Sequence, residues 1–519
     1  MYATITDPIE LKPVAERGLG RQLVHNSIAT FVFYIISALV GIWYVPFIVK
    51  NLGVSQYAVA QLAAGFIGYM QFVTTGIAGS VGRFVTADFA RNDLAAANRT
   101  FNTYLVAAER VTLILSVVIG VVVWLVVPLL EYPPSQLSAT RFVFAAILFS
   151  AVIQVWCMCF DCAFWVSGRF DIRNAVLIVE LLIRTGTVYA LFHMTQPSLW
   201  HIGIACLLAP IGSLMLYILA WSRLTPSLSI SRKLFDRDRF GEIRGLGGWL
   251  LILQFGGVLQ FNAELLVLNL LLGNKLQGSY GILLVWVTIL RGLFSSLGQL
   301  ISPSIAALHA SGETKRLASL SRTAVRAQGL LIAIPVGVLC GLAGAALNWW
   351  MGPEFRFLAP LAWLILVPLV IEGSFNPVSI LVSMPDTVKF FAKSALVIGV
   401  ANVILGVILV KYTGLGMYGM ALAVAITSII RHGIVMPIYA AHLMKQPWYL
   451  LIQQQAQTVI QLGLTGAIAL YVAQYVGTAR SLPNLVTAAF AAGSVATLLA
   501  LLQLSRDERT RLIAVIRRR

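Results

Sequence analysis

Two charged side chains stand one helical turn apart in a segment that is otherwise apolar. Glu180 and Arg184 interrupt residues 176–192, which read VLIVELLIRTGTVYALF. At positions i and i+4 of a helix they share a face, so they could neutralise each other as a structural pair. Alternatively, they could face a polar cavity and contact a ligand, because an arginine at the bilayer centre costs at least ~2.5 to 3.5 kcal/mol. The sequence leaves both possibilities open.

Polar side chains follow one face of two further apolar segments, at the spacing of three and four residues that a helix requires. The first stripe consists of Thr288, Arg291, Ser295 and Gln299, and the second of Asn26, Thr30, Tyr34, Ser37, Gly41 and Tyr44. The seventh predicted span adds polar residues without this regular spacing: Gln254, Gln260, Asn262, Glu264 and Asn269. Ser, Thr and Asn could serve hydrogen bonds between helices, but the charged members need water or a ligand.

The depth of the arginines indicates an anionic ligand. With a rise of 1.5 Å per residue, Arg184 and Arg291 each lie about 15 Å into a predicted span. The arginine fork can donate two parallel hydrogen bonds to a phosphate group. The predicted ligand-binding residues are Arg184, Arg291, Arg431, Glu180, Gln299, Asn26 and Tyr34. The predicted ion-coupling residues, for a proton or a sodium ion, are Glu264, Glu372 and Asp161, the last of which could instead be a solvated helix end.

Membrane helices must position these side chains. Of 519 residues, 59% are hydrophobic and only 11% are charged, and the mean hydropathy is +0.86, far from the composition of soluble domains. Apolar windows of about 20 residues predict an all-α integral membrane protein with fourteen spans. The predicted spans are 28–49, 57–79, 104–128, 142–163, 174–194, 199–222, 248–272, 279–302, 328–348, 359–382, 391–411, 416–440, 455–478 and 483–504.

The distribution of Lys and Arg predicts the orientation of the chain. With the N-terminus inside, 27 of the 37 basic residues fall on cytoplasmic segments and five on outer loops, as the positive-inside rule requires. Both termini are therefore predicted to be cytoplasmic. The net charge of +17 is mainly an insertion signal, with contact to anionic lipids as a secondary effect, and gives no reason to expect nucleic-acid binding.

The two halves of the chain repeat a pattern in the same membrane orientation. NLGVSQYAVAQL follows the first predicted span and LLGNKLQGSYGIL follows the seventh, so that Leu-Gly precedes Tyr57 in one copy and Tyr280 in the other. The repeat predicts two six-helix bundles in parallel arrangement plus two C-terminal helices. The predicted divisions are an N-terminal segment 1–27, a bundle 28–222, a basic cytoplasmic linker 223–247, a second bundle 248–440, two additional helices 441–504 and a basic tail 505–519.

Residues 20–105 carry a recognisable order of features: Asn26, Pro46, Leu52-Gly53, Tyr57 and then GIAGSVGRFVTADFARNDLAAANRTFNT. In these features the chain resembles the polysaccharide transporter family of the multidrug/oligosaccharidyl-lipid/polysaccharide exporter superfamily. The resemblance implies a V-shaped pair of bundles with a cationic central cavity in a bacterial inner membrane. It also implies that alternating access moves an undecaprenyl-diphosphate-linked glycan to the periplasmic leaflet, for O-antigen, lipopolysaccharide or exopolysaccharide assembly. Membrane lipids and polysaccharide polymerase machinery are further candidate partners.

Alternatives from the same superfamily are a lipid II flippase and a multidrug exporter. The Ser-Arg and Gly-rich motif of the former and the acid in the first span of the latter are both missing. A different class, a membrane-embedded polymerase, ligase or acyltransferase, would need a catalytic cluster on a large outer loop, and the predicted outer loops are short. No enzyme activity is therefore expected. The spacing of Cys157, Cys159 and Cys162 does not suit zinc, and no metal or other cofactor is predicted.

Overall fold

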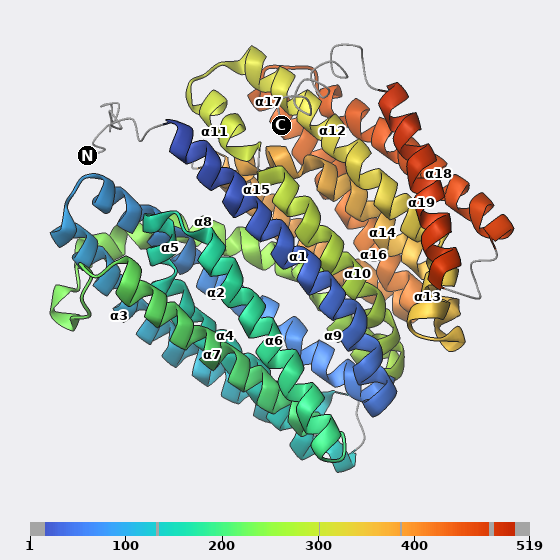
Figure 1. Ribbon diagram of the computed structural model, residues 1–519, viewed down its shortest axis with the longest axis horizontal. Helices are drawn as coiled ribbons and strands as arrows, with labels where there is room; N and C mark the ends of the chain where they lie inside the picture. Colours follow the sequence, from blue (N-terminus) through green and yellow to red (C-terminus); the bar gives the residue numbers. More distant parts are fainter. Residues whose placement is uncertain (1–15, 131–133, 300, 385–386, 477–481, 504–519) are drawn as a thin grey trace.

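The computed structural model describes residues 16–130, 134–299, 301–384, 387–476 and 482–503, and the regular elements in these ranges are helices (Figure 1). Those of the first half are α1 (Glu16–Leu52), α2 (Val54–Ala90), α3 (Leu94–Val121), α4 (Leu137–Phe160), α5 (Cys162–Ser167), α6 (Phe170–Met194) and α7 (Leu199–Leu224). Those that follow are α8 (Arg237–Phe261), α9 (Ala263–Leu272), α10 (Asn274–Gln299), α11 (Ser302–Ala310), α12 (Thr314–Gly341), α13 (Ala343–Trp350), α14 (Ala359–Phe375), α15 (Val388–Tyr412), α16 (Met417–Ser428), α17 (Met436–Leu443), α18 (Leu450–Val476) and α19 (Leu482–Gln503).

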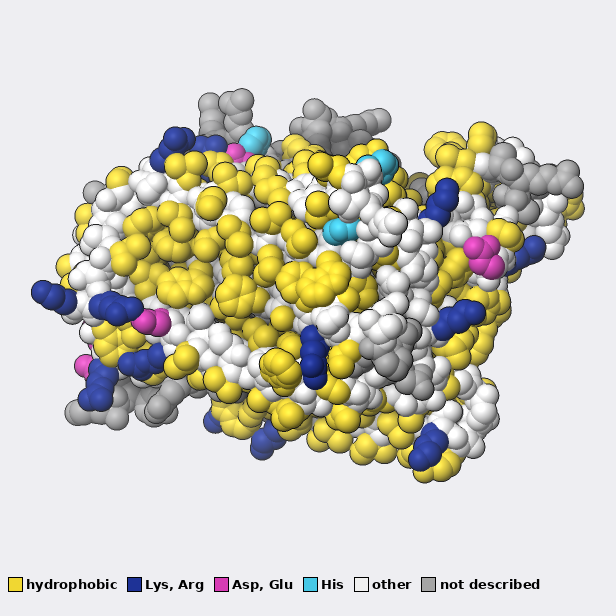
Figure 2. Space-filling view, turned by 90° about the horizontal axis from the view of Figure 1, so that it is seen from below, with side chains coloured by type: hydrophobic (Ala, Val, Ile, Leu, Met, Phe, Trp, Pro, Cys, Tyr) yellow, Lys and Arg dark blue, Asp and Glu magenta, His cyan; other side chains and the backbone are white. Residues whose placement is uncertain are grey.

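The helices have the lengths that a bilayer requires. Thirteen helical segments of the described chain are long and apolar enough to cross a membrane, and large hydrophobic side chains cover much of the exposed surface (Figure 2). The remaining predicted span, 57–79, lies within α2, a helix of 37 residues, some of whose side chains are outside the described part. The predicted all-α membrane fold of about fourteen helices is thereby confirmed.

The repeated sequence pattern has the same backbone conformation in both copies. After the first helix of each half the chain turns at a glycine with positive φ, 81° at Gly53 and 84° at Gly273, a region that favours glycine. The turns that follow α2 and α11 also match. In each, the residue before the acid, Asp93 or Glu313, is left-handed, with φ of 57° at Asn92 and 71° at Gly312. These matching turns place α2 and α10 at equivalent positions in the two halves.

Several predicted spans are interrupted helices, and three of these spans are interrupted in the middle of the molecule. One is broken at Asp161, between α4 and α5, and another at Asn262, between α8 and α9. A third contains a π-helical segment, η7 (Ile429–Val435), between α16 and α17. The break at Asn262 depends on tertiary structure, because its side chain occupies the space above Gly68 of α2, where a Cβ atom would lie 2.7 Å from the amide carbon.

Two helices begin earlier than predicted. α1 begins at Glu16, inside the predicted segment 1–27, and α8 begins at Arg237, inside the predicted linker 223–247. The start of α8 has a local cause: the Asp236 carboxylate accepts hydrogen bonds from the backbone N–H groups of Asp238 and Arg239, at 2.9 and 3.1 Å. The predicted tail 505–519 lies outside the described residues.

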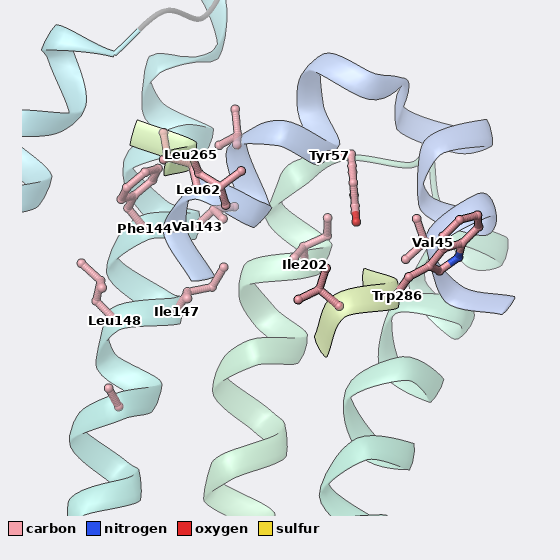
Figure 3. Close-up of a cluster of buried hydrophobic side chains, with 14 of the residues drawn as sticks. Val45, Tyr57, Leu62, Val143, Phe144, Ile147, Leu148, Ile202, Leu265 and Trp286 are labelled. Carbon is pink, nitrogen blue, oxygen red and sulfur yellow. The ribbon is translucent and has the colours of Figure 1, made fainter. Parts of the chain in front are cut away.

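In Figure 1, α3, α4, α6 and α7 of the first half and α12, α14 and α16 of the second half lie on opposite sides of α1. At the end predicted to face outward, α2 and α10 approach closely, since a Cβ atom on Gly278 would lie 2.7 Å from the Val54 carbonyl oxygen. One buried apolar cluster spans both halves at this level and includes Tyr57, Val143 and Ile202 together with Leu265 and Trp286 (Figure 3). This contact closes one end of the space between the halves.

The last two helices are packed onto the second half through small residues. Gly337 and Gly341 on α12 face Thr465 and Ala469 on α18, and a Cβ atom on either glycine would come within 2.7 Å of its neighbour. The Gln455 amide of α18 also donates hydrogen bonds to the carbonyl oxygens of His432 (2.9 Å) and Ile371 (3.3 Å). α18 therefore joins three other elements of the bundle.

Candidate binding cavity

A cavity of about 940 Å³ lies between the two halves. Its wall includes side chains of α1, α2, α4, α6 and α7 from the first half and of α8, α9, α10, α14 and α16 from the second. Seven acidic or basic side chains line it: Asp161, Arg173, Glu180, Arg184, Glu264, Arg291 and Glu372. Three arginines thus face four carboxyl groups, so the cavity is of mixed charge and differs from the cationic chamber implied by the family resemblance.

One face of α6 supplies the cavity with a row of charges. Arg173, Glu180 and Arg184 lie at intervals of seven and four residues, which aligns them on one side of a helix. Arg184 is exposed and Glu180 is half-buried. The two are not ion-paired, and no carboxylate of the described residues forms a salt bridge with Arg184. The Arg184 guanidinium is therefore open to a ligand.

Arg291 has a partner on another helix. Its Nε and Nη2 atoms donate to the two carboxylate oxygens of Glu372, at 2.8 and 3.0 Å. The guanidinium carbon lies 4.3 Å from the centre of the Phe261 ring, a cation–π geometry. The Arg291 side chain is still 36% exposed, against 13% for Glu372. An anion could reach Arg291, but it would compete with a bidentate carboxylate.

The other acids of the cavity differ in how they are compensated. Asp161 accepts from Arg173 Nε at 2.7 Å and from Trp165 Nε1 at 2.9 Å, so it is a member of an ion pair. Glu264 is only 4% exposed, and the hydroxyl of Tyr280 donates to it at 2.6 Å. Among the described residues Glu264 forms no salt bridge, so its direct partner is a neutral hydroxyl, and the Arg291 guanidinium acts on it only from a longer distance.

Three predicted binding residues lie away from the cavity lining. Arg431 is only 7% exposed, within η7, and its Nη1 atom donates to Gln260 Oε1 at 2.7 Å. The Asn26 amide donates to the Gly168 carbonyl oxygen at 2.9 Å, which ties α1 to the turn before α6. Gln299 is exposed at the end of α10. Tyr34 does line the cavity, where Gly292 leaves room for its ring.

Several lining residues escaped the sequence-based prediction. Arg173 directly precedes the predicted span 174–194 and is therefore one of the 27 basic residues counted as cytoplasmic, although its register with Glu180 and Arg184 places it on the same helix face. The pairing of Arg291 with Glu372 joins residues 81 positions apart and left no local signal. Gln61 and Phe261 carry no sequence pattern that distinguishes them from ordinary membrane-helix residues.

Comparison with known proteins gives one sequence relative and several structural ones. No protein-family model matches the chain. The uncharacterized membrane protein EpsK of Bacillus subtilis is 29% identical over 421 residues, which cover 80% of this chain and 83% of EpsK. An inward-facing multidrug resistance MATE family transporter of the MOP superfamily superposes with a TM-score of 0.63 at 13% identity, over 81% of this chain and 98% of the transporter. The lipid II flippase MurJ in an inward closed conformation superposes with a TM-score of 0.63 at 15% identity, over 92% of this chain and 98% of MurJ.

Proposed function

We propose that this chain belongs to the multidrug/oligosaccharidyl-lipid/polysaccharide exporter superfamily, whose fold it shares, and that it is a flippase for a polyprenyl-diphosphate-linked oligosaccharide. The proposed direction is from the cytoplasmic to the periplasmic leaflet of a bacterial inner membrane, by alternating access, in surface polysaccharide assembly. The observation that carries the proposal is the exposed Arg184 guanidinium, which has no carboxylate partner in the described chain and lines a cavity shared by both halves.

The chemistry of Arg184 suits a diphosphate. A guanidinium donates two parallel hydrogen bonds to phosphate oxygens, and in a cavity surrounded by apolar helices the attraction is stronger than in bulk water. Polar side chains elsewhere in the cavity lining, such as Tyr34, Gln61 and Gln154, can donate to or accept from sugar hydroxyls. The polyprenyl chain would remain in the lipid beside the helices.

Ion coupling is assigned to Glu264 in preference to the other predicted acids. Protonation of Asp161 or Glu372 would break an ion pair, whereas Glu264 is held by the neutral hydroxyl of Tyr280. Loss of the Glu264 charge would leave three arginines against three carboxylates, so a proton bound there brings the lining to zero formal charge for the return of the empty carrier. A proton at Glu264 is therefore the proposed coupling ion, with sodium as the alternative.

The test is Arg184→Ala in cells whose own copy is deleted. Surface polysaccharide is expected to be lost and its lipid-linked precursor to accumulate, while the variant remains inserted at the normal level. Arg223→Ala is the matched control, because Arg223 is an exposed arginine at the end of α7 outside the cavity lining. Normal surface polysaccharide in the Arg184 variant would contradict the proposal.

A second candidate function is export of an organic cation. The four carboxyl groups of the cavity favour it, as they outnumber the arginines. The two functions are separated by the same deletion strain: sensitivity to lipophilic cationic dyes with intact surface polysaccharide supports the exporter, and the reverse result supports the flippase.

A further inference from the structure

A second cavity, of about 730 Å³, lies outside the space between the two halves. It is enclosed by the end of α12, by α13, by the 3₁₀ helix η5 (Pro353–Leu358) with the start of α14, and by the last turns of α18. These elements meet at the lower right of Figure 1, at the end of the molecule predicted to face outward. The two C-terminal helices thus contribute a wall to a site that is separate from the central cavity.

The second cavity is polar at its rim and apolar further in. Asn348, Arg356 and Gln474 lie near the ends of their helices, and Trp363 and Leu470 lie about one helical turn deeper. Arg356 is exposed, and no carboxylate of the described chain forms a salt bridge with it. The cavity therefore offers one uncompensated positive charge above an apolar pocket.

Neighbouring aromatic residues indicate the depth of this cavity in the membrane. Trp349 and Phe357, on the same segment, are 46% and 48% exposed, and exposed aromatic rings are typical of the level of the lipid headgroups. The segment is also held in place. The Trp350 ring stacks on Trp286 with 5.6 Å between ring centres, and its N–H donates to the Ile42 carbonyl oxygen at 2.6 Å.

We propose that this cavity binds one anionic phospholipid of the outer leaflet. The phosphate is bound by Arg356, with Asn348 and Gln474 near the headgroup, and the first methylene groups of an acyl chain lie against Trp363, Leu470 and Ala473. Charge complementarity selects an anionic headgroup. The apolar wall selects a lipid over free phosphate, since each buried CH₂ group contributes about 0.8 kcal/mol.

The test measures lipid retention by the full-length chain, purified from bilayers that contain equal amounts of phosphatidylglycerol and phosphatidylethanolamine. Native mass spectrometry is expected to show one retained phosphatidylglycerol. Arg356→Gln is expected to reduce its retention about tenfold, the effect of losing one charge-assisted contact. Lys411→Gln is the matched control, because Lys411 is an exposed base at the same predicted face but outside this cavity.

Two further measurements make the assignment specific. Ala473→Phe should fill the cavity and displace the lipid in a variant that keeps Arg356, and millimolar inorganic phosphate should not displace it. Equal retention of phosphatidylglycerol by the wild-type protein, Arg356→Gln and Ala473→Phe would overturn the proposal. Displacement of the lipid by inorganic phosphate, or retention of phosphatidylethanolamine as strong as that of phosphatidylglycerol, would also overturn it.

Discussion

Arg184 and Arg291 are both predicted to bind the ligand, yet their surroundings differ. No carboxylate of the described residues forms an ion pair with Arg184, whereas Arg291 forms a bidentate ion pair with Glu372. The sequence could show that both lie deep in the membrane, because depth follows from position along a span. It could not show which arginine is compensated, because the partner of Arg291 comes from a helix remote in sequence.

The pair of Arg291 and Glu372 should behave as a unit. Arg291→Ala or Glu372→Ala alone leaves one charge uncompensated in a largely buried place and is expected to cost about 3 kcal/mol of stability. The double variant should regain most of that loss. Thermal unfolding of the purified protein in detergent measures the three effects. Additive losses in the double variant would mean that the two groups do not stabilise each other.

A substitution that keeps the positive charge of Arg184 but removes its planar guanidinium gives a sharper test of phosphate contact. Arg184→Lys should keep part of the translocation rate, because a lysine ammonium attracts a diphosphate but cannot donate two parallel hydrogen bonds. Arg184→Gln should retain almost none. The rate of flipping of a fluorescent polyprenyl-diphosphate sugar in proteoliposomes measures this difference, and equal rates in both variants would argue against direct contact with phosphate.

At the scale of helices, three of the breaks lie at the central cavity. Asp161 and Asn262 stand at two breaks and Ser428 immediately precedes η7, and all three line the cavity. Hydropathy predicted the spans that contain them but not the breaks, because an apolar window records composition and not which neighbour accepts a side chain. Asn262 illustrates the point, since its position depends on Gly68.

The contact of α2 with α10 provides a prediction at this scale. Gly278→Val would force a side chain against the Val54 carbonyl oxygen and Ala58, at a cost of about 1 to 3 kcal/mol in the closed arrangement. The outer end should open more often, so a cysteine introduced at Ser37 in a cysteine-free background should react faster with an external maleimide. Gly463→Val, where no atom lies within 4 Å of the added Cβ, should leave the rate unchanged.

At the scale of the whole molecule, the number of helices and the repeat of the two halves followed from hydropathy and from the two Leu-Gly turns. The mixed charge of the cavity did not follow, because it is set by which side chains from ten helices share one space. Arg173, counted as a loop residue, is one of them.

The C-terminal helices are expected to be needed for the fold. A chain that ends at Leu443 would expose Gly337 and Gly341 of α12 and remove the Gln455 hydrogen bonds. We expect it to aggregate in detergent, as measured by size-exclusion chromatography of a fluorescent fusion. If the truncated chain is monodisperse but does not translocate its cargo, the C-terminal helices are needed for transport and not for folding.

The near balance of acidic and basic groups in the central cavity has an electrical consequence. If Glu264 is protonated, the lining groups sum to zero formal charge, so the empty carrier crosses the transmembrane field with little electrical work. If Glu264 gives up that proton before the outward step, a carrier loaded with a doubly charged diphosphate moves three negative charges, worth about 6.9 kcal/mol at 100 mV. A voltage that is negative inside would then drive the loaded step outward and leave the return step indifferent to it.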